Sequence, residues 1–139
     1  MNMMKRILCL FVTTFVFIHV ITSCSKENTP TAPSLSPVGT WIGTGQYGNT
    51  LGNPTYVFSL TFKSNGTIDI LGNNSTGIDN ATGTWQLVQD SVKAFYKYTG
   101  SSANYTLSAK YVSTSTSLVG TIGLETATTG VGLFSVIRQ

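Results

Sequence analysis

From Val38 onward, the chain alternates between apolar and polar residues in short segments that end at turn-forming residues. The clearest segment is YVFSLTF at 56–62, where an aromatic or aliphatic side chain fills every second position. Because successive side chains of a β-strand point to opposite faces, this pattern predicts strands with one buried and one exposed face. No long stretch follows the 3.6-residue period of a helix, so the sequence predicts an all-β domain over 38–139.

Eight segments fit this description, and turn signals separate them. Asn65-Gly66 predicts a type I′ hairpin turn, because both residues tolerate positive φ angles. Residues 72–81 are rich in Asn, Gly and Ser, and we expect them to form a loop. The predicted strands are 38–48, 56–63, 67–71, 82–89, 92–98, 105–111, 118–124 and 131–138.

Consecutive strands with one apolar face must cover that face. A flat sheet would leave it in water and would expose two unpaired edges. Closure into an up-and-down antiparallel barrel solves both problems, because the apolar face turns inward and the first strand pairs with the last. A β-sandwich is the alternative, but it needs longer crossover connections, and only 72–81 is long enough. The sequence therefore predicts a small eight-stranded antiparallel barrel.

Aromatic residues are expected to form the core of this barrel. Each large aromatic side chain buries about 150–250 Å², worth roughly 25 cal/mol per Å², so aromatic burial can replace the disulfides of other small secreted domains. The aromatic residues that alternation places inward are Trp41, Tyr56, Phe58, Phe62, Trp85, Tyr96, Tyr98, Tyr105, Tyr111 and Phe134.

The first residues have the pattern of a secretory signal. Lys5 and Arg6 precede an uncharged, mostly apolar stretch at 7–22, the arrangement of a basic n-region and an apolar h-region. A transmembrane helix is the alternative, but a span needs about 20 apolar residues, and this stretch is shorter. It ends in ITSC, which resembles the lipobox of bacterial lipoproteins. That resemblance implies cleavage before Cys24 and acylation of its sulfur and its amine.

Lipidation of Cys24 implies stable membrane anchorage, since two or more acyl chains hold a protein on a bilayer. The other cysteine, Cys9, lies within the signal, so no internal disulfide is expected after cleavage. Three prolines interrupt the polar stretch before the barrel, and we expect an extended linker there. The predicted organisation is a signal peptide at 1–23, lipidated Cys and linker at 24–37, and barrel at 38–139. We expect the protein in the cell envelope, anchored to the outer membrane.

Removal of 1–23 leaves a nearly neutral chain with six Lys and Arg residues against five Asp and Glu residues. Without a basic cluster, nucleic acid is not an expected partner. The remaining chain has no histidine, and its acids are scattered, so we expect neither enzyme activity nor a cofactor. Asp69 and Asp79 could meet across the predicted loop and hold calcium, but solvated loop acids are favoured and no metal site is predicted.

VGTWIGTG at 38–45 places Gly39 and Trp41 at the start of the first strand, similar to the G-x-W signature of the lipocalin and avidin superfamily. LTFKSNGT, GTWQLVQDSV, LVGTIG and GLFSVIR, which follow in that order, resemble the lipocalin-like domains of lipoproteins from Gram-negative bacteria. The resemblance implies a calycin-type barrel in which a last-strand arginine packs on the first-strand tryptophan. It therefore implies a barrel-closing pair of Trp41 and Arg138. The T-D-Y motif of lipocalins and the later tryptophans of avidins are absent.

The same resemblance implies binding of a small apolar ligand. Barrels of eight strands either hold one small ligand or are filled by side chains. The alternative is therefore a solid scaffold whose loops, at 48–54 and 72–81, bind an envelope protein or polymer, as an inhibitor or assembly component does. Asp90-Ser91-Val92 resembles an O-glycosylation acceptor, which makes Ser91 a candidate site. The candidate ligand-lining residues are Tyr56, Phe58, Trp85, Tyr96, Tyr98, Tyr105 and Tyr111.

Overall fold

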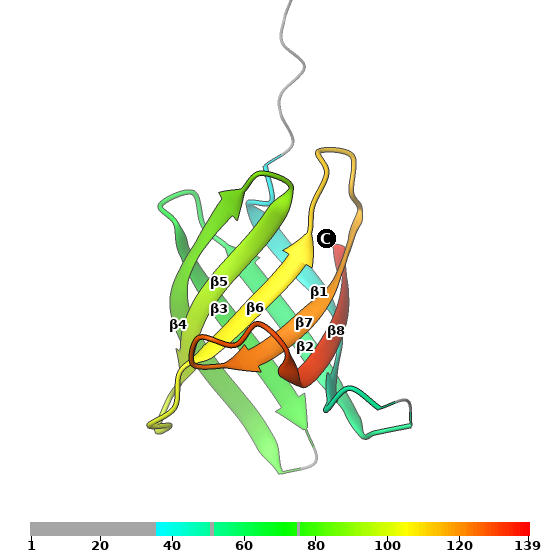
Figure 1. Ribbon diagram of the computed structural model, residues 1–139, viewed down its shortest axis with the longest axis vertical. Helices are drawn as coiled ribbons and strands as arrows, with labels where there is room; N and C mark the ends of the chain where they lie inside the picture. The colour runs from blue at the N-terminus through cyan, green and yellow to red at the C-terminus, as the bar shows by residue number, and fades with distance from the viewer. Residues whose placement is uncertain (1–35, 51, 75) are drawn as a thin grey trace, which may run out of the picture. The chain divides into compact units, whose positions relative to one another are not determined.

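The computed structural model describes residues 36–50, 52–74 and 76–139, which form eight strands and no helix (Figure 1). Cys24 and the predicted signal peptide lie outside the described residues. The strands are β1 (Gly39–Tyr47), β2 (Thr55–Phe62), β3 (Thr67–Asn74), β4 (Gly77–Val88), β5 (Ser91–Tyr98), β6 (Tyr105–Lys110), β7 (Ser117–Leu124) and β8 (Gly130–Arg138).

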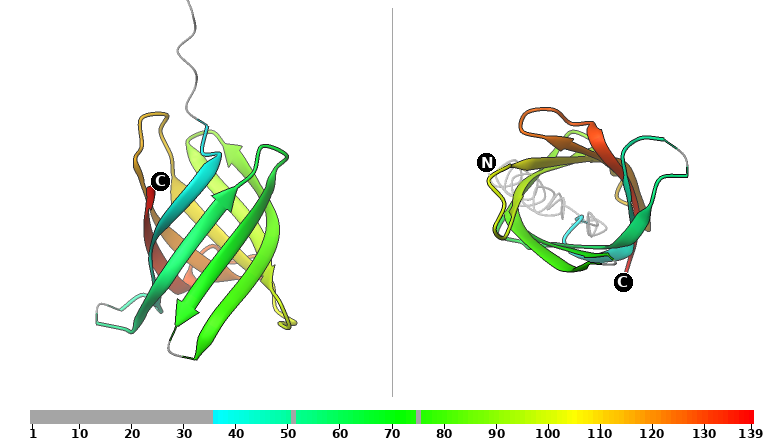
Figure 2. Two further views of the ribbon diagram at one scale, coloured as in Figure 1. Left: turned by 180° about the vertical axis from the view of Figure 1, so that it is seen from behind. Right: turned by 90° about the horizontal axis from the view of Figure 1, so that it is seen from below.

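Each strand pairs antiparallel with the next, and β8 pairs antiparallel with β1. The sheet therefore closes into a barrel, which Figure 2 shows from the side and from below. At the seam, Trp41 of β1 lies opposite Arg138 of β8, and Gly45 lies opposite Phe134. The prediction of an eight-stranded antiparallel barrel is confirmed, and the β-sandwich alternative is not the observed fold.

The connections between strands alternate between the two ends of the barrel. The end where β1 begins and β8 ends also carries the β2–β3, β4–β5 and β6–β7 connections, at the top of Figure 1. The other four connections lie at the bottom. We call the first end, with Trp41 and Arg138, the closed end, and the second, with Tyr47 and Tyr98, the open end.

The interior of the barrel is a packed apolar core. Leu60 and Ile68, for example, are fully buried on neighbouring strands. Full burial of such a side chain contributes about 1.5–3 kcal/mol. Every aromatic residue predicted to face inward belongs to this core or packs against it. The buried hydrophobic residues are Trp41, Phe58, Leu60, Phe62, Ile68, Ile70, Ala81, Val92, Ala94, Tyr96, Leu107, Ala109, Tyr111, Leu118, Ile122, Phe134 and Val136.

The prediction of a loop at 72–81 is wrong. β3 continues to Asn74 and β4 already begins at Gly77, so the two strands form one long hairpin. Their Cα pairing continues without a break to the end of both strands. Small and polar residues are usual in loops, but here the inward positions Gly72 and Asp79 face a cavity rather than a packed core. A strand at the open end therefore does not need the apolar alternation that identifies the other strands.

The prediction of a type I′ turn at Asn65-Gly66 is also wrong. Gly66 has a φ of 81°, but Asn65 is not among the residues with positive φ. The N–H of Gly66 donates to the carbonyl of Lys63 at 3.1 Å, which gives a type I turn followed by a left-handed glycine. The Asn65 Oδ1 accepts hydrogen bonds from the N–H and the hydroxyl of Thr67, at 3.0 and 2.7 Å. These bonds tie the Asn65 side chain to the following strand, as in an Asx turn.

Candidate functional site

The closed end of the barrel is sealed by a stacked pair. The guanidinium carbon of Arg138 lies 4.6 Å from the centroid of the Trp41 ring. The indole N–H of Trp41 donates to the carbonyl of Pro37 at 2.8 Å, and Arg138 donates to the carbonyls of Ser36 and Val38 at 2.6 and 3.4 Å. A cation over an indole face is worth roughly 0.5–2 kcal/mol. The structure thus brings together the two residues that the resemblance pairs, and the chain before β1 is held across this end.

Two of the residues predicted to line a ligand site also lie at the closed end. Tyr111 packs edge-on against Trp41, with ring centroids 6.5 Å apart. Trp85 packs edge-on against Phe62 at 5.3 Å, and its indole N–H donates to the carbonyl of Lys63 at 2.9 Å. Neither Trp85 nor Tyr111 lines the cavity at the open end, which corrects the prediction for both residues. Alternation fixes the face of the sheet that a side chain occupies but not its height along the barrel axis.

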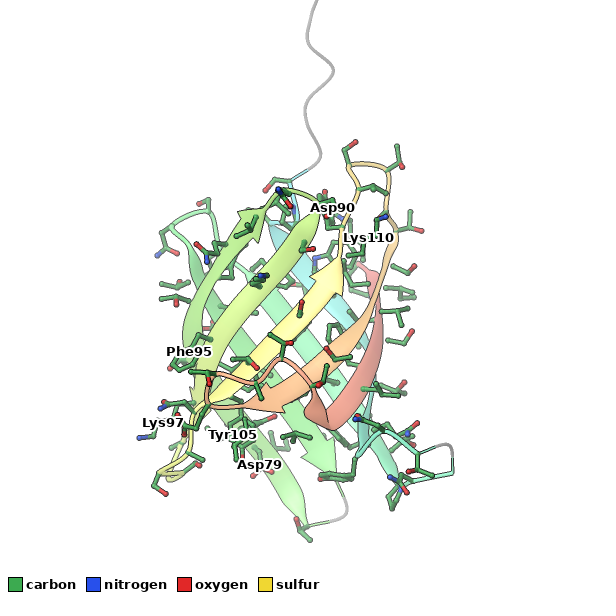
Figure 3. The ribbon with its side chains drawn as sticks, viewed as in Figure 1. Asp79, Asp90, Phe95, Lys97, Tyr105 and Lys110 are labelled. Carbon is green, nitrogen blue, oxygen red and sulfur yellow. The ribbon has the colours of Figure 1, made fainter. Side chains whose placement is uncertain are left out.

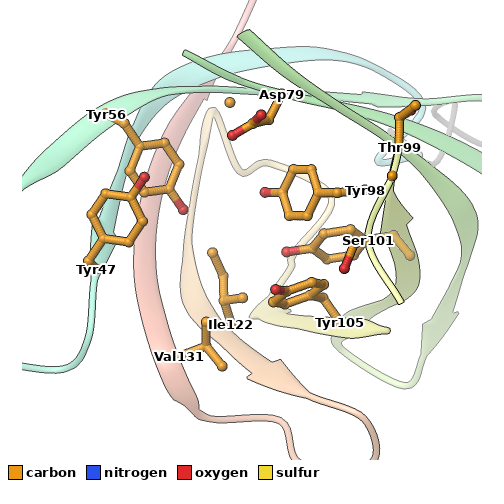
Figure 4. A pocket seen from close by; sticks show the side chains of 12 residues that line it. Tyr47, Tyr56, Asp79, Tyr98, Thr99, Ser101, Tyr105, Ile122 and Val131 are labelled. Atoms are coloured by element: carbon orange, nitrogen blue, oxygen red, sulfur yellow. The ribbon is translucent and has the colours of Figure 1, made fainter. Parts of the chain in front are cut away.

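The open end of the barrel holds a cavity of about 430 Å³ (Figure 4). Five of the six tyrosines in the chain line it. A volume of about 300–1,000 Å³ is typical of small-molecule pockets, so this cavity is the candidate functional site. The lining residues are Tyr47, Tyr56, Gly72, Asp79, Tyr96, Tyr98, Thr99, Gly100, Ser101, Tyr105, Ile122 and Val131.

Three tyrosines from β5 and β6 form one wall of the cavity. Tyr96 lies opposite Tyr105 across the two strands, and their rings are stacked with centroids 5.7 Å apart. Tyr98 packs edge-on against both rings, at 5.6 and 5.3 Å. Each such pair adds roughly 0.5–1.5 kcal/mol to the gain from burial. The wall is therefore preorganised by contacts among its own rings.

Two further tyrosines stand on the side of the cavity formed by β1 and β2. The rings of Tyr47 and Tyr56 have centroids 4.7 Å apart. A Cβ atom added at Gly45 would lie 2.4 Å from the Tyr56 ring, and one added at Gly72 would lie 3.7 Å from it. The Tyr56 ring therefore fits against β1 only because Gly45 has no side chain.

Phe58 lies beneath these tyrosines and does not line the cavity, contrary to the prediction. It is fully buried, with its ring edge-on to Tyr56 at 5.7 Å and close to Phe134 at 5.8 Å. Phe58 is the next inward position of β2 toward the closed end, where the barrel is already filled. Its role is to support the Tyr56 ring from below.

Burial raises the pKa of three of the cavity phenols. The pKa of Tyr98 rises to about 12, chiefly by burial, and the negative charge of Asp79 acts in the same direction. Burial also raises the pKa values of Tyr56 and Tyr96 far above the ordinary value, with neighbouring phenols adding to the effect. These three hydroxyls are therefore neutral at physiological pH, and each can both donate and accept a hydrogen bond.

The hydroxyl of Tyr96 stands out among them. Tyr96 is 2% exposed, and its oxygen has no hydrogen-bond partner among the described residues. The Tyr98 hydroxyl lies close enough to raise the pKa of Tyr96 through its charge and through a hydrogen-bonding interaction, although the two hydroxyls do not meet the strict geometry of a hydrogen bond. An unpaired buried hydroxyl costs about 1–3 kcal/mol. Tyr96 lines the cavity, but its hydroxyl oxygen is closed to solvent.

The sequence identified part of this site and missed part of it. Tyr56, Tyr96, Tyr98 and Tyr105 were predicted to line a ligand, and the structure places all four around the cavity. Tyr47 was missed, although the alternation that turns Trp41 inward also turns Tyr47 inward six residues later. Asp79 was missed because its segment was interpreted as a loop. Ile122 and Val131 lie on predicted strands, but nothing in their pattern distinguishes cavity from core.

The remaining candidate residues lie away from the cavity. Ser91 begins β5, is partly buried, and donates to a carboxylate oxygen of Asp90 at 3.4 Å. Asp69 forms an ion pair with Lys63 at 2.6 Å, whereas Asp79 faces the cavity, so the two acids do not form the calcium site considered above. Across 36–50, 52–74 and 76–139, no group of three or more His, Cys, Asp or Glu residues could hold a metal ion.

Within the part of the chain that the structure describes, there is no helix of sufficient length and hydrophobicity to span a bilayer. In comparisons with known proteins, no family model, curated protein or solved structure matches this chain. A functional argument must therefore start from the geometry and chemistry of the site.

Proposed function

We propose that this protein is a lipid-anchored envelope protein whose barrel binds one small ligand in the open-end cavity. The observation that carries the proposal is a tyrosine-lined cavity of about 430 Å³ in a barrel whose other end is filled. Tyrosine rings offer apolar contact, and their hydroxyls can fix the orientation of a bound molecule. The closed eight-stranded topology is compatible with a lipocalin-like fold, and we propose that relationship as well.

The proposed role is binding rather than catalysis, with no cofactor. The lining residues include no histidine, no cysteine and no lysine, and Asp79 is their one carboxylate. General acid–base catalysis is most efficient when a positioned group titrates near the working pH. Tyr56, Tyr96 and Tyr98 have pKa values far above it. The site is therefore better suited to holding a molecule than to transforming one.

The proposed anchor is Cys24, on the strength of the lipobox resemblance. Acylation there, together with a linker over 24–37, gives a tethered receptor for a ligand in the cell envelope, at the outer membrane. At about 3.1 Å per residue, an extended linker of this length reaches roughly 40 Å from the lipid surface. Such a reach leaves the open end of the barrel free to exchange its ligand with the surrounding solution.

A second candidate function, binding of an envelope protein, is favoured by an apolar patch on the outside of the barrel. Ile42 of β1 and Ile137 of β8 are cross-strand neighbours and are 40% and 58% exposed. Val119, on the adjacent strand β7, is 65% exposed. Contiguous exposed apolar residues mark interaction surfaces in soluble domains. This role does not need the cavity, so the two functions can be tested separately.

A pair of tryptophan substitutions on β7 tests the proposal. I122W fills the cavity, because Ile122 is buried and lines it, whereas V119W changes the outer face of the same strand. The full-length protein and both variants are purified from their own envelope and studied by native mass spectrometry with lipid extraction. We expect acylation of Cys24 in all three, and a bound small molecule in the wild type and V119W but not in I122W.

Other results bear on separate parts of the proposal. Equal amounts of bound molecule in I122W and the wild type, or none in any sample, contradict the ligand cavity. A co-purifying protein that V119W releases supports the second function. An unmodified Cys24 contradicts the lipid anchor.

A further inference from the structure

We infer that the ligand of the open-end cavity carries a protonated amine that points at Asp79. This inference rests on the proposed binding function and specifies the chemistry of the occupant. Asp79 is the one carboxylate among the lining residues, and no Lys, Arg or His is among them. Asp79 is exposed at the open end, and a carboxylate beside a cleft with low-dielectric walls makes the potential there negative and raises the local concentration of cations.

Two lysines of the barrel form ion pairs with other carboxylates. Lys63 pairs with Asp69 at 2.6 Å, and Lys110 pairs with Asp90 at 3.6 Å. Figure 3 shows Asp90 and Lys110 near the top of the barrel, whereas Asp79 and Lys97 lie near the bottom. Lys97 is exposed on the outer face of β5 and does not line the cavity. Because Asp79 is the one charged residue of the lining, a ligand carboxylate or phosphate would meet a like charge there, and an ammonium group would meet an opposite one.

The oxygen atoms around the cavity fit an ammonium group in number and direction. In Figure 4 the hydroxyls of Tyr56, Tyr98 and Tyr105 and the carboxylate of Asp79 all point toward the middle of the cavity. A primary ammonium has three N–H donors and no acceptor, so it can use several converging oxygens at once. A quaternary ammonium has no N–H to donate, and an alcohol has a single donor.

The rest of the ligand should be apolar. Ile122 and Val131 lie across the cavity from Asp79 in Figure 4. The tyrosine rings add flat apolar surface, and their faces attract cations. We therefore describe the ligand as an amphipathic amine, with its ammonium group at Asp79 and its hydrocarbon body against Ile122 and Val131. The apolar ligand expected from the sequence is retained as the body of this molecule.

Three probes of similar shape and different charge test the inference. The full-length protein in detergent is titrated calorimetrically at neutral pH with 2-phenylethylamine, 2-phenylethanol and 3-phenylpropanoate. We expect the amine to bind about tenfold to hundredfold more tightly than the alcohol, as for a charge-assisted hydrogen bond, and the carboxylate to bind most weakly. This comparison uses the wild-type protein and does not depend on the folding of any variant.

Two matched asparagine substitutions then locate the charge. D79N should lower the affinity for the amine about tenfold and leave the affinity for the alcohol unchanged. D69N removes a carboxylate from the outer face of β3, the strand beside Asp79, and should change neither affinity.

Alcohol binding as tight as amine binding overturns the inference and leaves the ligand cavity standing. An amine preference that D79N does not reduce also overturns it. If no probe binds, the amine inference fails, and the mass spectrometry of I122W decides the cavity separately.

Discussion

The buried hydroxyl of Tyr96 marks a residue where a substitution is expected to raise stability. Its oxygen is buried and has no hydrogen-bond partner among the described residues, so replacing it by hydrogen removes a desolvation cost that no hydrogen bond offsets. We expect Tyr96→Phe to raise the free energy of unfolding by about 1 kcal/mol in urea titrations of the ligand-free protein. The same variant should leave the affinity for the amine probe unchanged, because this oxygen is closed to solvent. A variant that is less stable than the wild type would show that the hydroxyl has a partner in solution.

The pKa values of the cavity phenols predict a loss of stability in alkaline solution. In the unfolded chain these phenols ionise near pH 10, whereas in the barrel Tyr98 ionises at about 12, and the pKa values of Tyr56 and Tyr96 are also raised. At a pH between the pKa of a phenol in the unfolded chain and its pKa in the barrel, the unfolded state binds fewer protons than the folded state. The free energy of unfolding is therefore unaffected below about pH 10 and falls as the pH rises above it. Urea unfolding at increasing pH measures the slope.

The contribution of each phenol to that slope can be separated by phenylalanine substitution. Each fully protected tyrosine contributes at most about 1.4 kcal/mol per pH unit. Tyr98→Phe should therefore make the profile shallower, and Tyr56→Phe combined with it shallower still. A slope that neither substitution changes would mean that other groups cause the alkaline loss.

At the level of single residues, the sequence predicted which side chains face inward but not which of them meet the cavity. Tyr98 and Trp85 both follow the strand alternation, yet one lies at the open end and the other at the closed end. The position of each side chain along the barrel axis depends on the register and tilt of all the strands. The alternation of apolar and polar residues carries no information about either. The pairing of Trp41 with Arg138 came from a resemblance between sequences rather than from alternation.

Several inward-facing glycines of the strands leave no room for a Cβ atom, so a single added methyl group is expected to be costly there. A Cβ atom at Gly83 of β4 would lie 2.1 Å from the backbone oxygen of Phe95. The backbone of a paired strand cannot move aside as a flexible side chain does. We expect Gly83→Ala to lower the free energy of unfolding by roughly 1–3 kcal/mol, measured in urea.

Gly72 of β3 is the matched control for Gly83. A Cβ atom there would meet side chains only at ordinary contact distances, 3.7 Å and beyond. Gly72→Ala should therefore be neutral, or stabilising by about 0.4–1 kcal/mol through reduced freedom of the unfolded chain. Equal losses for the two substitutions would mean that the close approach at Gly83 is not what limits the barrel.

At the level of strands, the alternating segments were predictable and the β3–β4 hairpin was only partly so. Ile68 and Ile70 identify the first half of β3, because their neighbours on the inner face are apolar. The second half faces a cavity, where a small Gly72 and a charged Asp79 are as suitable as apolar side chains. The composition of this segment therefore favoured a loop at the place where the cavity lies.

At the scale of the whole molecule, the proposed function divides stability and binding between the two ends of the barrel. The closed end joins the first and last strands through Trp41 and Arg138 and is filled with aromatic rings. The open end has a cavity and a carboxylate. Closure of the barrel was predictable, since eight strands with one apolar face have few other ways to cover it. The cavity at the open end was not predictable, because it depends on how far the core side chains extend along the barrel axis.

This division predicts that Arg138 affects unfolding and leaves ligand binding unchanged. Arg138→Ala removes the stacking on Trp41 and the bonds to the carbonyls of Ser36 and Val38, so we expect a loss of roughly 2 kcal/mol in the free energy of unfolding. Arg138→Lys keeps the charge but not the planar fork, and should lose part of that amount. Urea unfolding and amine titration of the same samples give both quantities.

Asp79→Asn should have the opposite effect and lower the affinity for the amine probe. It should leave the free energy of unfolding nearly unchanged, because the Asp79 side chain lies at an exposed position of the open end. If each substitution changes both quantities in proportion, then the two ends are coupled through the barrel wall. Coupling would have to pass through the packed core between the ends, where the fully buried Phe58 supports the Tyr56 ring. Phe58→Leu would then weaken amine binding in proportion to its loss of stability, whereas independent ends predict a larger effect on stability than on affinity.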